Sequence, residues 1–86
     1  MESEFDQSKS RLNKAKHGVD FVEAQALWHD SELLEIPLTL DDEPRSLVVG
    51  VVGEKHWSAI ITYRQARIRI ISVRRSRDRE RELYEG

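Results

Sequence analysis

The chain has 86 residues, no cysteine and a formal net charge of −2. This length fits one small domain over residues 1–86, and the absence of cysteine excludes disulfides and thiolate metal sites. The first residues lack a basic-then-apolar signal pattern, and every apolar run is too short to span a membrane. We therefore expect a cytoplasmic protein with no membrane partner.

Charge is unevenly distributed along the chain. Residues 1–44 carry 4 basic and 11 acidic side chains, and residues 45–86 carry 10 basic and 5 acidic ones. Eight arginines lie between Arg64 and Arg81, against two acids. A nearly neutral chain can therefore offer one strongly positive surface, and arginine suits bidentate contacts with phosphate or carboxylate. The alternative is an ordinary solvated charged surface.

Two helices are predicted in the N-terminal part. Asp6 is a good N-cap, and the stretch DQSKSRLNKAK predicts a helix of about three turns that ends at His17-Gly18. Leu12 and Ala15 are its expected apolar contacts. Asp20 and Glu23 form a capping-box pattern that predicts a second helix over residues 20–30. An apolar stripe on this second helix is expected in the core and comprises Phe21, Ala24, Leu27 and Trp28.

Strands are predicted in the remainder, followed by one helix. The expected strands cover residues 33–40, 45–52, 57–64 and 66–75, and the last helix runs from about Ser76 to Tyr84. An acidic loop at residues 41–44, a turn at residues 53–56 and a tight connection at Gln65-Ala66 join the strands. The predicted fold class is α+β: a small antiparallel sheet of about four strands with two N-terminal helices and a C-terminal helix.

The last hairpin fixes a pairing register. A two-residue turn at residues 65–66 pairs Arg64 with Arg67, Thr62 with Arg69, and Ile60 with Ile71. One face near the turn then carries three arginines and a hydroxyl. Like charges directly opposite each other destabilise a sheet, which favours an anion bound between them. Under strict alternation Arg74 points away from Arg69, so a bulge is required if both belong to one site.

Three further polar residues are candidates for proton transfer. Glu80 and Tyr84 share one face of the last helix at i, i+4 spacing. A carboxylate among arginines either acts as a general base or orients a guanidinium. His17 is either a helix-end residue of the common kind or a catalytic imidazole. His29 and Asp30 have no second ligand cluster at metal spacing, so no metal site is predicted.

Taken together, these motifs resemble those of the BrnT family, the ribonuclease half of the BrnT/BrnA type II toxin–antitoxin systems. The matching blocks span about residues 5–84 and are Phe5-Asp6-x-x-Lys9, Asn13-x-x-Lys16-His17-Gly18-Val19-x-Phe21-x-x-Ala24, Asp30, Arg45, Arg67-Ile68-Arg69-Ile70-Ile71-Ser72-x-Arg74-Arg75, Glu80 and Tyr84. Arg77 stands where the family often has a capping threonine, so Ser76 is expected to cap the last helix instead.

The resemblance implies a RelE-like fold and RNA cleavage without metal or cofactor, which blocks translation and growth. It implies a BrnA-like antitoxin partner with a ribbon-helix-helix domain, and binding of operator DNA only through the antitoxin complex. The polar positions carried over from the family are Lys16, His17, Arg64, Arg69, Arg74, Glu80 and Tyr84.

A mechanism follows if the 2′-hydroxyl of RNA attacks the neighbouring phosphate. We expect Arg69 and Arg74 to hold the scissile phosphate and stabilise its added negative charge. RNA-binding roles are expected for Lys16, Arg64, Arg67 and Arg75. Tyr84 is expected to stack on a base or donate a proton, and His17 or Glu80 to accept one. The alternatives are a non-catalytic nucleic-acid-binding module and a protein-interaction module that uses the same arginines.

Overall fold

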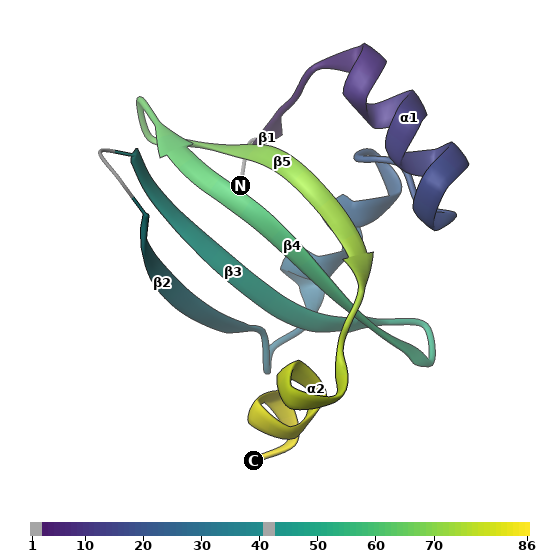
Figure 1. Ribbon diagram of the computed structural model, residues 1–86, viewed down its shortest axis with the longest axis vertical. Coiled ribbons are helices and arrows are strands. Elements are labelled where there is room, and N and C mark those ends of the chain that lie inside the picture. Colours follow the sequence, from purple (N-terminus) through teal and green to yellow (C-terminus); the bar gives the residue numbers. More distant parts are fainter. Residues whose placement is uncertain (1–2, 41–42) are drawn as a thin grey trace.

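The computed structural model describes residues 3–40 and 43–86, which form a five-stranded sheet, two α-helices and a 3-10 helix (Figure 1). The strands are β1 (Ser3–Glu4), β2 (Leu34–Leu40), β3 (Glu43–Val52), β4 (Lys55–Arg64) and β5 (Arg67–Arg75). The helices are α1 (Gln7–His17), the 3-10 helix η1 (Glu23–His29) and α2 (Asp78–Glu85). The mixed α+β class is confirmed.

The sheet has the strand order β1-β5-β4-β3-β2. Strands β2 to β5 form the predicted antiparallel meander, whereas β1 is an additional strand that pairs in parallel with β5. The prediction of about four strands was therefore one strand short. A two-residue strand is too short to produce a recognisable alternation, which is why the sequence predicted only a lead-in there.

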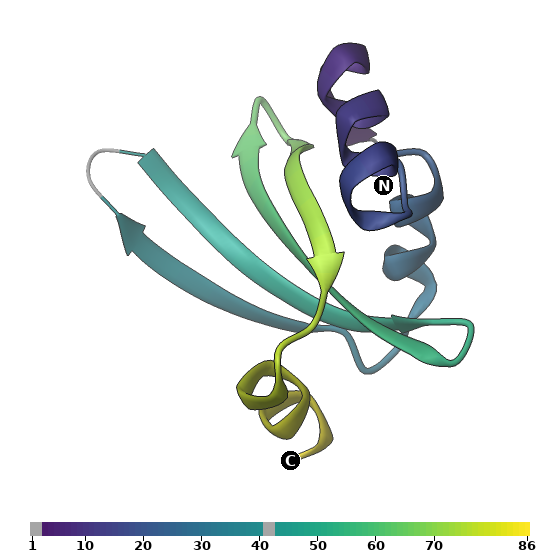
Figure 2. The same cartoon turned by 45° about the vertical axis from the view of Figure 1, so that its right-hand side comes forward.

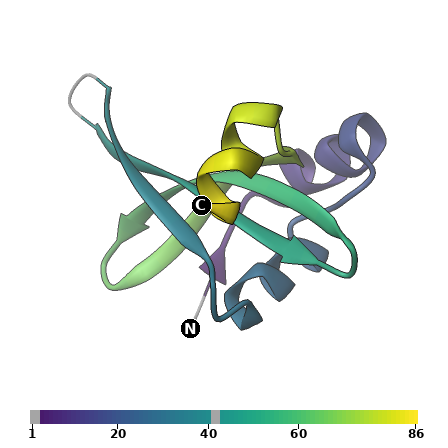
Figure 3. The ribbon, with the colours of Figure 1, turned by 90° about the horizontal axis from the view of Figure 1, so that it is seen from below.

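The helices lie on different sides of the sheet. Helix η1 packs on β3 from one face, α2 contacts β3 from the other face, and α1 runs alongside β5 (Figures 2 and 3). We call the face under η1 the core face and the face that carries α2 the open face. In the part of the chain that the structure describes, no helix is long and apolar enough to cross a membrane.

The hydrophobic core lies between η1 and the core face. The predicted stripe supplies Phe21, which precedes η1, and Ala24 and Leu27 of η1, all at most 2% exposed, and Trp28 packs at the margin. The strands supply their inward-facing aliphatic residues, which are Val48, Ala59, Ile61, Ile68, Ile70 and Val73. The helix predicted over residues 20–30 is a shorter 3-10 helix, Glu23–His29, and three of the four predicted core residues are fully buried.

Helix α1 begins and ends as the sequence predicts but packs differently. The Asp6 side chain accepts a hydrogen bond from the Lys9 N–H, and Gly18 ends the helix in the left-handed region at φ 85°. The predicted apolar contacts were wrong, because Leu12 is 68% exposed and Ala15 also faces solvent. Helix α1 instead buries two polar residues against the rest of the fold, Ser10 and Asn13.

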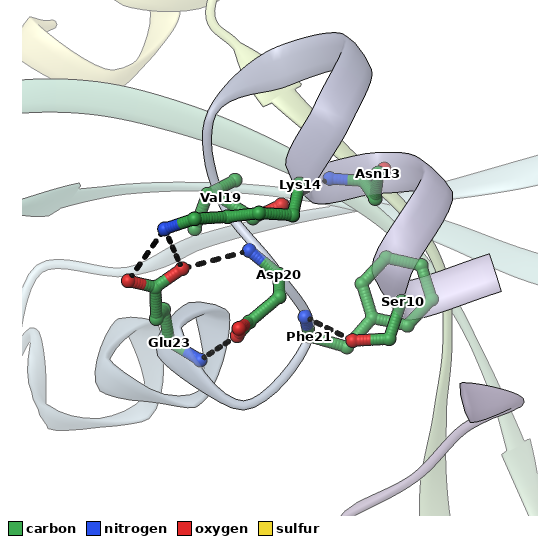
Figure 4. A network of polar contacts seen from close by, with 7 residues as sticks. All are labelled: Ser10, Asn13, Lys14, Val19, Asp20, Phe21 and Glu23. Carbon is green, nitrogen blue, oxygen red and sulfur yellow. Dashed lines mark hydrogen bonds and ion pairs between the residues drawn. The ribbon is translucent and has the colours of Figure 1, made fainter. Parts of the chain in front are cut away.

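Hydrogen bonds replace apolar contacts where α1 meets the segment that leads into η1 (Figure 4). The Ser10 hydroxyl accepts from the Phe21 N–H at 2.9 Å. Asn13 donates to the Val19 carbonyl at 2.7 Å and to the Val73 carbonyl at 2.9 Å, and accepts from the Val73 N–H. Asn13 therefore ties α1 to β5 through the backbone of Val73, which keeps the helix beside the strand.

The reciprocal bonds of the predicted capping box are present, but they close the turn before η1, whose N-cap is Val22 without a side-chain bond. The Glu23 N–H donates to Asp20 at 2.7 Å, and the Glu23 carboxylate accepts from the Asp20 N–H at 2.9 Å. Lys14 of α1 forms an ion pair with the same carboxylate at 2.8 Å (Figure 4). The hydrogen bond from Lys14 is the main cause of the lowered pKa of Glu23.

The strand connections differ from the sequence predictions at two of three places. Of the predicted acidic loop, residues 41 and 42 lie outside the described residues, whereas Glu43 and Pro44 already pair with β2. The β3–β4 turn contains residues 53 and 54 only, so His56 belongs to β4. The two-residue turn at residues 65–66 is confirmed; its residues have φ of 51° and 66°, as a type I′ turn requires.

Candidate functional site

A β-bulge in β5 decides which arginines share the open face. The predicted pairs Arg64–Arg67 and Thr62–Arg69 are confirmed, but Ile60 pairs with Ser72 rather than with Ile71. The irregularity lies between Ile60 and Ile61 on β4, so Ile71 is the extra residue of β5. Because one inserted residue reverses the alternation, Arg74 returns to the face of Arg69.

The hairpin end of the open face carries an arginine cluster. By the pairing register, Arg45, Arg64, Arg67 and Arg69 lie on this face together with Thr62. Arg69 lies 3.7 Å from the carboxylate of Glu4, its neighbour in β1. One oxygen of that carboxylate is buried without a hydrogen bond among the described residues. Glu4 holds Arg69 at the sheet edge through charge rather than through a close bidentate contact.

Arg74 and Glu80 form the most closely bonded pair of the open face. The Arg74 guanidinium donates to both Glu80 oxygens, at 2.8 and 2.7 Å, and these side chains are 26% and 11% exposed. The Ser58 hydroxyl and the Arg77 N–H donate to the same carboxylate, each at 2.9 Å. The bond from Arg74 is the largest cause that lowers the pKa of Glu80 to about 2, and Glu80 in turn raises the pKa of Arg74.

These contacts define what each member of the pair is able to do. A carboxylate with a pKa of about 2 is a weak proton acceptor at neutral pH, so the geometry favours the alternative in which Glu80 orients a guanidinium. Arg74 uses three of its donors on Glu80 and on the Arg75 carbonyl. A guanidinium has five N–H donors, which leaves two for an anion from outside.

The beginning of α2 differs from the prediction. Helix α2 starts at Asp78 with Arg77 as N-cap, and the Ser76 hydroxyl bonds to the Ser58 hydroxyl at 2.7 Å instead of capping. Glu80 satisfies the Arg77 N–H at the helix start. Because α2 is capped at Arg77 and not at Ser76, the Glu80 side chain points toward the sheet, where it bonds to Arg74.

Tyr84 lies beyond this pair and is bonded to Asp30. Its hydroxyl donates to the Asp30 carboxylate at 2.6 Å, and this bond, with burial, raises the pKa of Tyr84 to about 12. Burial alone raises the pKa of Asp30, but hydrogen bonds from Tyr84 and from the Val51 and Glu32 N–H groups outweigh it and lower that pKa. The His56 ring meets the Tyr84 ring edge-on at 5.3 Å, and its Nε2 lies 2.8 Å from the Glu85 carboxylate.

The other predicted site residues lie away from Tyr84. Lys16 and His17, with Lys9, line a groove between α1 and β5 that ends at Ile71 and Ser72 of the bulge. That groove therefore adjoins β5 between Arg69 and Arg74. Arg75 is positioned differently, because its guanidinium lies 5.5 Å from the centre of the Trp57 ring and donates to the His56 carbonyl.

The sequence reasoning missed three polar residues of this region. Ser58, which is 1% exposed, was predicted only as part of a strand. Asp30 was assigned to the end of the second helix, and His56 was assigned to a turn. Once β4 starts at Lys55, strand alternation places His56 on the same face as Ser58, so a correct strand start would have revealed it. Over residues 3–40 and 43–86, no group of three or more His, Asp or Glu side chains is arranged to hold a metal ion.

A comparison with protein families decides the identity of the chain. The model of the ribonuclease toxin BrnT of type II toxin–antitoxin systems matches residues 5–80, which includes the bulge, the arginine cluster and Glu80. The chain belongs to the BrnT family. Members of this family are toxins with ribonuclease activity, and a type II system pairs such a toxin with an antitoxin. No curated protein matches the chain.

Proposed function

We propose that this BrnT-family chain is a metal-independent endoribonuclease that binds RNA along the open face of its sheet. The observation that carries the proposal is the bulge at Ile71, which gives Arg74 the same face as Arg64, Arg67 and Arg69. Without this inserted residue, Arg74 would lie on the core face. The arginines of the open face would then end at Arg69 instead of continuing along β5 to Arg74. Arginine is the side chain best suited to bind successive phosphates.

Arg74 is the proposed phosphate ligand at the point of cleavage. Glu80 fixes its guanidinium from one side, and its two remaining donors are available for the phosphate of a bound RNA. As the 2′-hydroxyl attacks, negative charge grows on the phosphate oxygens, and a donor fixed in advance stabilises it without reorganisation. Glu80 is thus a positioning residue in this scheme.

Arg69 and Arg74 bind different phosphates in this proposal. Their partners on β4, Thr62 and Ser58, are four residues apart, which corresponds to about 13 Å along the strand. That separation favours contacts with different phosphates of one RNA strand over the shared phosphate expected from the sequence. Arg64, Arg67 and Arg69 then steer and hold the strand, and Arg74 acts at the scissile bond.

Proton transfer is assigned to residues beside the arginines of the open face. Tyr84 has a raised pKa and donates to Asp30, so we assign it base stacking rather than proton donation. His17 is the proposed proton acceptor, because its groove adjoins β5 between Arg69 and Arg74, and Lys16 is proposed to bind the RNA strand there. Arg75 lies with Trp57 on the core face, opposite the arginines of the open face, so we no longer propose an RNA contact for it there.

The biological context follows from the family. We propose that RNA cleavage occurs in the cytoplasm and blocks translation and growth. The proposed partner is a BrnA-like antitoxin with a ribbon-helix-helix domain, and operator DNA is bound only through that antitoxin. The uneven charge distribution along the chain supports this arrangement, because a strongly basic surface attracts an anionic ligand such as RNA.

The test combines cleavage by the purified chain with growth. We expect RNA cleavage in the presence of EDTA, products with 2′,3′-cyclic phosphate ends, and growth arrest on induced expression. Arg74→Ala is expected to lower the rate of RNA cleavage by a factor of about 10²–10³. Arg69→Ala is expected to lower it by a smaller factor. Arg79→Ala is the matched control, since Arg79 of α2 is 78% exposed and pairs only weakly with Glu82 at 3.8 Å.

Three outcomes contradict the proposal and distinguish its alternatives. Full cleavage by both Arg69→Ala and Arg74→Ala refutes the proposed site. Salt-dependent RNA binding by the folded chain without any product identifies a non-catalytic nucleic-acid-binding module. Absence of RNA binding together with a tight complex with a small protein identifies an interaction module.

A further inference from the structure

A small pocket lies on the core face of the sheet, opposite the arginines of the open face. Its walls come from the segment that follows α1, from η1, and from β3, β4 and β5, and its volume is about 230 Å³. Apolar residues form most of its lining, and they are Val19, Ala24, Leu27, Val52, Trp57 and Val73. The proposed cleavage of RNA makes no use of this pocket.

The walls of the pocket suit an apolar occupant better than water. Ala24, Leu27 and Val73 are at most 2% exposed and form its floor. Val52 and Trp57 are partly exposed and form its mouth. Protein interiors seldom keep voids larger than one water molecule, and a trapped water needs polar partners. Because the floor offers only aliphatic side chains, the pocket is suited to an apolar group that enters from outside.

The mouth of the pocket carries unbalanced positive charge. In the part of the chain that the structure describes, the Lys55 ammonium lines the pocket without an ion pair or a side-chain hydrogen bond. The Arg75 guanidinium lies 5.5 Å from the centre of the Trp57 ring and donates to a backbone carbonyl. The carboxylate of the lining belongs to Glu23 and is already bonded to Lys14, at 2.8 and 3.0 Å (Figure 4). An anionic group at the mouth would therefore meet two cations.

We propose that this pocket binds a small aromatic carboxylate. The ring enters between η1 and the sheet and packs on the Trp57 indole, while the carboxylate stays at the mouth with Lys55 and Arg75. An apolar protein cavity of about 150 Å³ holds one benzene molecule, so a volume of about 230 Å³ has room for two fused rings. A ring fits better than an acyl chain, because aromatic pairs gain stability beyond the area that they bury.

The test is a titration of the purified, folded chain with naphthoate, followed by NMR. We expect saturable binding with a Kd of roughly 0.1–1 mM, as for a small ligand with few polar contacts. The Trp57 indole signal and the methyl signals of Val52 and Val73 are expected to shift. The indole signal of Trp28, which does not line this pocket, is the internal reference.

Two control ligands separate charge from shape. Naphthylmethanol keeps both rings but has no charge, so it is expected to bind about threefold to fivefold more weakly than naphthoate. Octanoate keeps the carboxylate but has no ring to pack on Trp57, and it is expected to be weaker as well.

Two substitutions test the two halves of the site. Lys55→Gln removes the charge of an exposed side chain and is expected to weaken naphthoate binding about threefold to fivefold. Val52→Phe places a ring in the mouth and is expected to abolish binding. The control for the first is Lys9→Gln, because Lys9 is exposed and lines the groove between α1 and β5. The control for the second is Val22→Phe, because Val22 is 60% exposed and does not line the pocket. Both controls are expected to keep the affinity of the parent chain.

Four results overturn the proposal. The first needs no substitution and is the absence of saturable shifts in the unaltered chain at ten times the expected Kd. The second is a set of shifts confined to residues outside the pocket. The third is an affinity for naphthylmethanol or octanoate that equals the affinity for naphthoate. The fourth is unchanged affinity of both Lys55→Gln and Val52→Phe. Binding is measured without RNA, so a chain that cleaves nothing refutes only the ribonuclease proposal.

Discussion

Replacement of Glu80 by glutamine tests how much the Arg74–Glu80 pair stabilises the fold. The pKa of Glu80 falls from the ordinary value of 4.5 to about 2, and one pKa unit corresponds to about 1.4 kcal/mol. The ionised carboxylate therefore contributes about 3 kcal/mol to the free energy of unfolding at neutral pH, which is a large share of the roughly 5–15 kcal/mol typical of a domain. Glutamine keeps the shape but removes the charge.

The pH dependence has a defined direction. Because the pKa of Glu80 is lower in the folded than in the unfolded chain, its contribution is complete above about pH 5 and disappears as the pH falls toward 2. The free energy of unfolding is measured with urea at pH 7, 4 and 3, using the fluorescence of Trp28 and Trp57. We expect a difference of about 3 kcal/mol between parent and Glu80→Gln at pH 7, and a smaller difference at each lower pH.

The control for this experiment lies on the same helix. Glu82 is 69% exposed and 3.8 Å from Arg79, so Glu82→Gln is expected to change stability by less than about 0.5 kcal/mol. A difference below about 1 kcal/mol for Glu80→Gln at pH 7 refutes the reasoning. So does a difference that stays constant on acidification, because it then arises from packing rather than from ionisation.

Three further predictions concern single residues. Asn13→Ala leaves the Val73 N–H and carbonyl without their partner and is expected to lower stability by about 1–3 kcal/mol in thermal unfolding, whereas Leu12→Ala is expected to leave it within about 0.5 kcal/mol. In an absorbance titration on a Tyr63→Phe background, Asp30→Asn is expected to lower the pKa of Tyr84 from about 12 toward its ordinary value of 10; an unchanged pKa contradicts the bond to Asp30. Ala66→Gly relieves the left-handed φ of 66° and is expected to raise the midpoint of urea unfolding; a lower midpoint contradicts the type I′ turn.

Local sequence signals predicted much of the fold. The turn at residues 65–66 and the strict alternation of residues 67–70 were sufficient to predict where β5 begins and how it pairs with β4 at the hairpin. The capping residues Asp6 and Gly18 were sufficient for the ends of α1. In each case the determining interactions lie within a few residues of one another, so a single sequence contains them.

Long-range contacts could not be predicted in the same way. Asn13 contacts Val73, and Tyr84 contacts Asp30, across separations of 60 and 54 residues. A helical hydrophobicity pattern assigns burial to Leu12 and has no means to assign it to a polar Asn13. The bulge left a weak trace, because the buried residues change from Ile68 and Ile70 to Val73 and so break the alternation. Only the pairing with β4 identifies the inserted residue.

Asn13 and β1 have a consequence for how the molecule meets other proteins. An unpaired sheet edge is a template for strand addition and aggregation. Here β1 covers Ile68 and Arg69, and the Asn13 amide occupies the backbone of Val73 as a neighbouring strand would. The opposite edge strand, β2, contains Pro37, which has no N–H to offer. With strand addition discouraged at both edges, the sheet offers other molecules its faces rather than its edges.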